Sequence, residues 1–125
     1  MPTIVRAKAE DTVCQEEEFG SFITLTTFSD EEEVVRMVND DTVYGLGGCV
    51  WTNDLKRAHR LAKKLRTSMV WVNAYKRGNA GSPFGGVGDS GYGRELSLEA
   101  MHEYTEAKSV WVNVDAPTVD WFGED

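Results

Sequence analysis

Residues Val43 to Tyr75 read VYGLGGCVWTNDLKRAHRLAKKLRTSMVWVNAY and contain a strand–helix–strand pattern. Val43 to Trp51 is a glycine-interrupted loop that leads into a short strand. An amphipathic helix is predicted from near residues 52–54 to about Arg66. Ser68 to Tyr75 is short, apolar, β-branched and aromatic, which is typical of a buried strand. The helix's apolar face consists of Leu55, Ala58, Leu61, Ala62 and Leu65, and its basic face of Lys56, Arg57, Arg60, Lys63 and Lys64. We interpret the basic face as solvated, or as docked against the acidic half of the chain (residues 10–41), rather than as an anion site.

Another strand and helix are expected upstream. Phe22 to Phe28 (FITLTTF) alternates and is rich in β-branched and aromatic residues, as strands are. Ser29 is predicted to cap the next helix, with Glu32 completing a capping box, and the helix is expected to end near residues 39–41. Strands that alternate with helices predict an α/β fold.

The downstream part begins with a long glycine-rich loop over residues 76–93, and loops of this length are usually functional or mobile. A helix is predicted over Leu96 to Tyr104, with Ser97 as a plausible cap. Thr105 to Val114 alternates and predicts a strand, and the polar tail after it is expected to be poorly ordered.

Composition limits the classes of function. With 125 residues, 41% hydrophobic and 27% charged, the chain has the size of one domain with one core. Its net charge of −8 argues against a nucleic-acid partner, because such binding depends on Lys and Arg at phosphates. No uncharged stretch approaches the ~20 apolar residues that span a bilayer, and no apolar segment follows Met1. We therefore expect a cytoplasmic protein with no membrane partner.

The sequence predicts no metal site. His59 and His102 stand alone, and neither Cys14 nor Cys49 lies in a pair with zinc-ligand spacing. Both cysteines are expected to be small buried hydrophobic residues. The residues Glu16 to Glu18 would disfavour a thiolate at Cys14, the opposite of what a nucleophile needs.

Residues Gly86 to Gly91 (GVGDSG) match the pattern GxGxxG but do not fit a phosphate-binding loop. That motif lies directly between a strand and the helix it opens. Here Pro83-Phe84-Gly85 precede it, and Tyr92-Gly93 would break a following helix.

Several motifs in order resemble the C-terminal part of the NAD(P)-dependent aldehyde dehydrogenase superfamily. They are EEEFG (Glu16 to Gly20), the run from Asn39 to Arg66, VWVN (Val70 to Asn73), SPFGG (Ser82 to Gly86), SGYGRE (Ser90 to Glu95) and EYTEAKSV (Glu103 to Val110). The resemblance implies an α/β fold, the C-terminal portion of an aldehyde-dehydrogenase-like catalytic domain with a closing oligomerisation strand. Residues 1–103 would be partial catalytic domain, 104–114 the oligomerisation strand and 115–125 a tail.

The same resemblance implies roles for five side chains. Glu17 aligns with the glutamate that holds the nicotinamide ribose hydroxyls, and Phe19 with an aromatic residue beside the nicotinamide; otherwise they would be an exposed acid and a core residue. Phe84 aligns with an aromatic of the substrate tunnel, and residues 75–81, beginning with Tyr75, with the variable loop that shapes it. Glu95 aligns with a glutamate implicated in proton relay, or is an acid at a helix start.

The function implied is oxidation of an aldehyde to a carboxylic acid with NAD or NADP, in a homo-oligomer formed through residues 104–114. The family's nucleophilic cysteine, general-base glutamate, oxyanion-hole asparagine and cofactor domain lie upstream of the matched region. The chain is therefore expected to be a C-terminal fragment that is inactive alone. The alternative is a non-catalytic remnant or interaction module that pairs with a full-length subunit through its C-terminal strand.

Three departures from the family pattern leave the aldehyde open. Ser21 replaces the usual proline, Gly88 stands where a lysine is common, and residues 76–81 are divergent.

Overall fold

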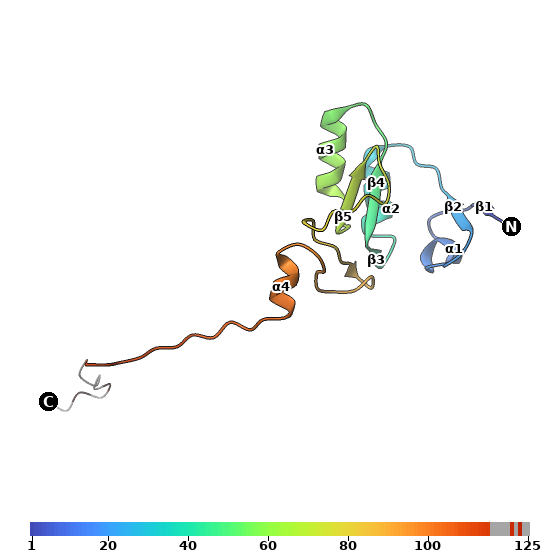
Figure 1. Cartoon of the computed structure of the whole chain (residues 1–125). Helices are drawn as coiled ribbons and strands as arrows, with labels where there is room; N and C mark the ends of the chain where they lie inside the picture. Colours follow the sequence, from blue (N-terminus) through green and yellow to red (C-terminus); the bar gives the residue numbers. More distant parts are fainter. Residues whose placement is uncertain (116–120, 122, 124–125) are drawn as a thin grey trace.

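The computed structural model describes residues 1–115, 121 and 123. Its elements form three separate two-stranded sheets with helices between them (Figure 1). In chain order they are β1 (Thr3–Arg6), α1 (Thr12–Gln15), β2 (Phe22–Leu25), α2 (Glu31–Asn39), β3 (Tyr44–Gly45), β4 (Gly47–Val50), α3 (Leu55–Lys64), β5 (Met69–Val72), β6 (Val87–Gly88) and α4 (Glu99–Glu103). None of the helices in these described residues is long and apolar enough to cross a membrane. The predicted disorder of the tail concerns mainly residues 116–120, 122, 124 and 125, which lie outside the described part.

The β4–α3–β5 unit confirms the predicted strand–helix–strand pattern. β4 and β5 are parallel, with Gly47 opposite Met69 and Val50 opposite Val72. The helix begins after Asp54, within the predicted start at residues 52–54, and ends at Lys64, just before the predicted end near Arg66. Asp54 caps it and accepts a hydrogen bond from the Arg57 amide at 3.1 Å.

Thr52, ahead of the helix, extends the pairing of β4 and β5. Its amide donates to Asn73 Oδ1 and its carbonyl accepts from Asn73 Nδ2, both at 2.8 Å. The side-chain amide of Asn73 thus takes the place of a further pair of backbone hydrogen bonds, which holds the end of β5 beside the start of α3.

The cap of α2 lies one residue beyond the predicted position. Asp30 is the N-cap, and its Oδ1 accepts from the Glu33 amide at 2.8 Å. Glu33 Oε2 in turn accepts from the Ser29 amide at 2.6 Å, so Ser29 contributes its backbone and not its hydroxyl. The preceding strand, β2, ends at Leu25 rather than Phe28, because its partner β1 is only four residues long.

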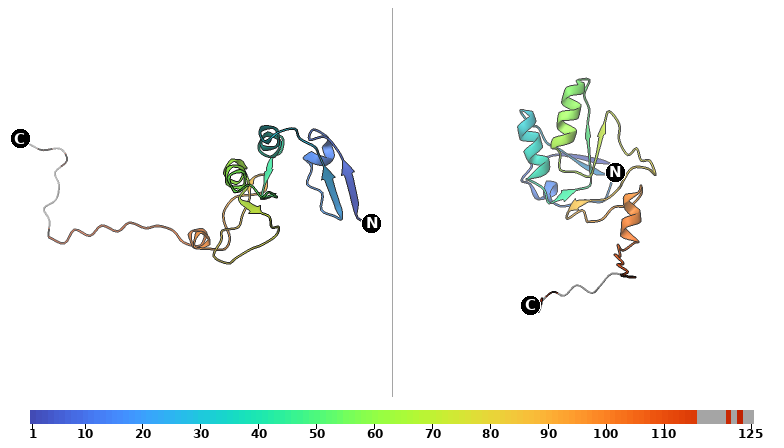
Figure 2. Two further views of the ribbon diagram at one scale, coloured as in Figure 1. Left: turned by 90° about the horizontal axis from the view of Figure 1, so that it is seen from above. Right: turned by 90° about the vertical axis from the view of Figure 1, so that its left-hand side faces the viewer.

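The helices α2 and α3 lie side by side, as both views of Figure 2 show. Glu31 joins them: its carboxylate accepts from Arg57 Nε at 2.7 Å and from Arg60 Nε and Nη2 at 2.8 and 2.7 Å. The two hydrogen bonds from Arg60, followed by the one from Arg57, lower the pKa of Glu31 to about 2. At the far end, the Asn39 side chain bonds the Lys64 carbonyl and the Arg66 amide at 2.8 and 2.7 Å.

The prediction of one ordinary core is wrong for this chain. The accessible surface is 10811 Å², whereas a folded monomer of this mass exposes about 6,700 Å². Among the described hydrophobic side chains only Ala58 and Leu61, at 3% and 8% exposure, are buried. The cause is architectural: three two-stranded sheets that do not merge leave faces uncovered. The expectation of buried cysteines fails for the same reason, since Cys14 is half-buried and Cys49 is exposed.

The C-terminal part also departs from prediction. Leu96 and Ser97 have left-handed φ values of 60° and 53°, so the helix cannot begin there and α4 starts at Glu99. Residues 105–114 form no strand within the described part and run away from the rest as an extended segment (Figure 1). A β-strand is defined by its hydrogen bonds to a partner strand, and no strand among the described residues lies beside this segment. Pairing of residues 104–114 with a neighbouring subunit remains a prediction.

Candidate functional site

A cavity of ≈ 530 Å³ lies beside β5 and is lined by three of the predicted site residues. Glu17, Tyr75 and Phe84 come from separate parts of the chain and meet there, together with Met69 and Trp71 of β5. We call this space the loop cavity, because residues 75–79 of the loop after β5 form much of its wall. It has a largely apolar and aromatic lining with one carboxylate, which is the composition of a small-molecule site.

The loop wall is held by the indole of Trp71. Its Nε1 donates to the Arg77 carbonyl at 2.7 Å, and its ring meets the Tyr75 ring edge to face with centroids 5.8 Å apart. Trp71 shares its face of the sheet with Met69, because successive residues of a strand alternate between faces. The loop therefore folds back over this face of β5 and carries Tyr75 with it.

Phe84 is positioned by an isolated bridge to Glu95. The Phe84 amide donates to the Glu95 carbonyl at 2.8 Å, and the Glu95 amide donates to the Phe84 carbonyl at 2.7 Å. Next to it the Ser68 hydroxyl donates to the Gly85 carbonyl, which ties the loop to the start of β5. Phe84 thus lies at a fixed point where two distant segments cross.

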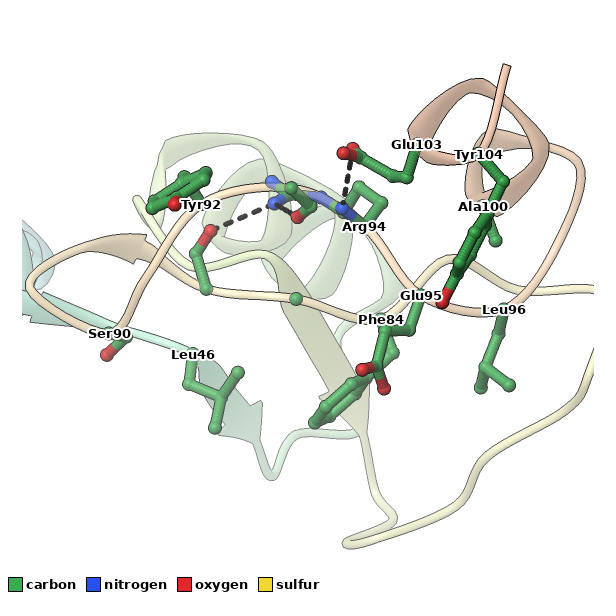
Figure 3. Close-up of a pocket in the computed structure, with 13 residues that line it drawn as sticks. Leu46, Phe84, Ser90, Tyr92, Arg94, Glu95, Leu96, Ala100, Glu103 and Tyr104 are labelled. Atoms are coloured by element: carbon green, nitrogen blue, oxygen red, sulfur yellow. Dashed lines mark hydrogen bonds between the residues drawn. The ribbon is translucent and has the colours of Figure 1, made fainter.

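A second cavity of ≈ 600 Å³ lies beside this bridge (Figure 3). Phe84 and Glu95 line it with Arg94, whose Nη1 donates to the carbonyls of Gly86 and Gly93 at 2.9 and 2.6 Å. A Cβ on Gly86 would come within 2.4 Å of the Ser90 carbonyl oxygen, so glycine is required for this close approach. Phe84 connects the second cavity with the loop cavity.

The structure relates the five predicted side chains unequally. Glu17, Tyr75 and Phe84 share the loop cavity, and Glu95 is linked to them through Phe84. Glu95 lies ahead of α4, whose first residue is Glu99, so it is not part of that helix. Phe19 is 90% exposed and lines neither cavity; it is not a core residue of this chain.

Neither cysteine takes part in the loop cavity. Cys14 lies on α1 beside Glu16 and Glu18 at a shallow depression, and Cys49 lies on β4 next to residues of α2 and α3. In the part of the chain that is described, no group of three His, Cys, Asp or Glu side chains could hold a metal ion. Among the described residues, the loop cavity therefore offers a binding surface to which neither cysteine contributes.

Sequence reasoning did not single out Trp71, Lys76 and Arg77, which all line the loop cavity. Period-two alternation through Met69 and Trp71 could have placed Trp71 on the cavity face. Nothing local marks Lys76, which adopts a left-handed φ of 52° that is uncommon outside glycine.

Comparison with known proteins gives a consistent result. The family model described as "Aldehyde dehydrogenase family" matches residues 1–110. Betaine aldehyde dehydrogenase of Bacillus subtilis (strain 168) is 43% identical over 122 residues, which cover 97% of this chain and 25% of that protein. The "NADP/NAD-dependent aldehyde dehydrogenase PuuC" of Escherichia coli (strain K12) is 42% identical over 116 residues, covering 92% of this chain and 23% of that protein.

Solved structures agree. PnpE from Pseudomonas sp. WBC-3 is 56% identical and superposes with a TM-score of 0.88 over 97% of this chain and 25% of that one. A structure of PnpE in complex with nicotinamide adenine dinucleotide, also 56% identical, gives a TM-score of 0.87 over the same shares. The chain spans about a quarter of the length of the relatives it matches.

Proposed function

The chain belongs to the aldehyde dehydrogenase family. From this premise we propose that the native polypeptide oxidises an aldehyde to a carboxylic acid with NAD or NADP. By native polypeptide we mean the protein, as the cell makes it, that contains residues 1–125. Residues 1–103 are then part of the catalytic domain and residues 104–114 an oligomerisation strand. The supporting observation is that Glu17, Tyr75 and Phe84 line one cavity although they are far apart in sequence.

The carboxylate of Glu17 fits one part of a dinucleotide cofactor, the ribose with its two hydroxyls. A carboxylate is an acceptor-only group that can take hydrogen bonds from two neighbouring ribose hydroxyls. Among the described residues no basic side chain forms an ion pair with Glu17, so its oxygens are available for hydroxyls. Phe19 follows two residues later, and its exposed ring provides an apolar surface beside the same ligand. When bound, the cofactor supplies the hydride acceptor.

The aldehyde is placed by the aromatic wall of the loop cavity. Tyr75 and Phe84 enclose its carbon chain, which removes water from that part of the substrate and restricts its orientation. Glu95, beside Phe84, is the carboxylate that takes part in carrying away the proton released as the acid forms.

The covalent chemistry needs more than these residues. Because neither Cys14 nor Cys49 lines the loop cavity, we assign the nucleophile to another part of the native polypeptide. Residues 1–125 alone are accordingly expected to form no NADH from any aldehyde.

The test is aldehyde-dependent NADH formation by the native polypeptide carrying Glu17→Gln. Charge-assisted hydrogen bonds contribute ~1.5–3 kcal/mol each, so kcat/KM for the cofactor should fall roughly tenfold or more. Glu18→Gln is the matched control, because Glu18 does not line the loop cavity. Equal kinetics for the two variants would remove Glu17 from the site. Absence of aldehyde oxidation by the unmodified polypeptide would refute the function.

A second candidate is an interaction module that pairs with another subunit through residues 104–114. It is favoured by the exposure of this extended segment, in which the Trp111 side chain is 93% exposed. Val112→Pro removes a backbone donor that a paired strand needs, whereas Val112→Ala keeps it. If the segment pairs, sedimentation should show a smaller assembly for the proline variant than for the alanine variant. Identical assemblies would exclude pairing at Val112.

A further inference from the structure

The loop cavity carries two cations that the assignments above leave unused. Lys76 and Arg77 both line it, and neither forms an ion pair with an acid among the described residues. Arg57 and Arg60, in contrast, are held by Glu31. Among the described residues, Glu17 is the only acid that lines the cavity, and the proposed function assigns it to the cofactor.

The backbone that bears these cations is anchored. The Arg77 carbonyl accepts the hydrogen bond from the Trp71 indole at 2.7 Å, which fixes the peptide next to the cavity. The Lys76 ammonium lies 5.5 Å from the centre of the Tyr75 ring, close enough for a cation–π contact. Lys76 also keeps a left-handed φ of 52°, a conformation that persists in a non-glycine residue where surrounding structure imposes it.

The end of the loop is tied down as well. The Gly81 amide donates to Asn79 Oδ1 at 2.7 Å, and the Ser97 amide donates to the Ala80 carbonyl at 2.8 Å. The loop is therefore bound at both ends, to β5 through Trp71 and to the segment before α4 through Ser97. Its two cations are presented from a defined backbone.

Resting on the proposed function, we propose that Lys76 and Arg77 make the loop cavity selective for aldehydes whose far end carries a carboxylate. A guanidinium matches a carboxylate with two parallel hydrogen bonds, and a nearby ammonium adds a second positive charge. The rings of Trp71, Tyr75 and Phe84 would contact the apolar or conjugated chain between the two ends of such a substrate.

The positive charges of Lys76 and Arg77 determine which aldehydes the cavity would favour. Residues 1–125 carry −8, so this part of the native polypeptide has no general attraction for an anionic substrate, and here only the local pair of cations can provide one. The same pair would repel an aldehyde with a cationic tail and has no specific partner in a neutral one.

The kinetic test compares 5-oxopentanoate with pentanal, which has the same chain length without the charge. We expect the native polypeptide to favour 5-oxopentanoate in kcat/KM by about tenfold or more, a preference that Lys76→Gln with Arg77→Gln abolishes. Turnover of pentanal should stay within about a factor of two, since its contacts are to the rings. Lys63→Gln with Lys64→Gln is the control, because these cations lie on α3 and outside the cavity.

A binding test separates this inference from the function on which it rests. Pentanedioate, the acid product of 5-oxopentanoate, is titrated into the native polypeptide by calorimetry. Its affinity should fall about tenfold in the Lys76 and Arg77 double variant and remain unchanged in the Lys63 and Lys64 control.

The outcomes are distinguishable. If no aldehyde is oxidised, the proposed function fails, and the titration still decides whether the cavity binds a carboxylate. Equal turnover of both aldehydes by the unmodified polypeptide overturns the inference, and so does equal binding of pentanedioate by the two double variants.

Discussion

The unit β4–α3–β5 and the segment of residues 105–114 have equally clear sequence patterns, but only the first forms the predicted elements in the described structure. In the first, α3 has a partner within the chain, and its side chains Ala58 and Leu61 are the described hydrophobic residues that are buried. In the second, Trp111 and its neighbours alternate as a strand does, yet they remain extended and exposed. A local sequence pattern therefore produces a packed helix or a paired strand only where the same molecule provides a surface or strand for it to pack or pair with.

Truncation of Leu61 should produce the largest loss of stability if burial is what distinguishes the first region. Leu61 is 8% exposed, and Leu→Ala at buried sites costs ~2–5 kcal/mol in the free energy of unfolding. Leu55→Ala on the same helix is the control, since Leu55 is 70% exposed. Urea denaturation of the native polypeptide measures both. Similar losses would mean that α3 is not anchored by its buried face.

Gly86→Ala should have the next largest effect and tests the glycine-rich loop. The added Cβ would lie 2.4 Å from the Ser90 carbonyl oxygen and 2.7 Å from the Ser90 Cβ, so the backbone must shift. Forced overpacking costs ~1–3 kcal/mol. Gly78→Ala is matched to it, because nothing lies within 4 Å of a Cβ there. A thermal unfolding midpoint unchanged by Gly86→Ala would show that this turn is not packed as described.

The cap of α2 supplies a smaller effect. Asp30→Ala removes the acceptor for the Glu33 amide and should lower the free energy of unfolding by about 1 kcal/mol. Ser29→Ala should leave it nearly unchanged, because Ser29 offers only its backbone amide. The reverse order of effects in denaturant titrations would restore Ser29 as the cap.

The smallest effect concerns the exposed ion pairs between α2 and α3. Hydrogen bonds from Arg60 and Arg57 lower the pKa of Glu31 from 4.5 to about 2. A carboxyl group whose pKa is lower in the folded state stabilises that state above its unfolded pKa, and this contribution is lost as pH falls from 4.5 towards 2. The Glu31→Gln variant should therefore differ from the unmodified polypeptide in thermal midpoint at pH 6 and converge with it near pH 2. A constant difference across that range would contradict the lowered pKa.

Added salt sharpens the same experiment. The side chains of Arg57 and Arg60 are about half exposed, so dissolved ions screen these pairs. The difference at pH 6 between the Glu31→Gln variant and the unmodified polypeptide should shrink in 1 M salt.

The elements that could be predicted are those whose signals are local. Apolar spacing around Leu61 and the β-branched run at Met69–Val72 were sufficient for α3 and β5. The cap of α2 was misplaced because Ser29 and Asp30 both suit an N-cap, and Glu33 decides between them through the Ser29 amide.

Burial and long-range placement could not be predicted in the same way. Cys49 belongs to a strand, but its exposure depends on whether a second layer covers β4. The left-handed backbone at Leu96 and Ser97 could not be predicted, because neither residue is a glycine. Glu17 reaches the loop cavity through tertiary structure, and only the resemblance to a family had singled it out.

The proposed ligands of the native polypeptide, the cofactor and the aldehyde, are expected to meet at the loop cavity. Hydrogen exchange of the native polypeptide, with and without NAD and a non-reactive carboxylic acid, tests this expectation most directly. We expect both ligands together to slow exchange in residues 16–20 and 75–86 and to leave exchange in α2 and α3 unchanged. Protection confined to α2 and α3, or absent from residues 75–86, would contradict it.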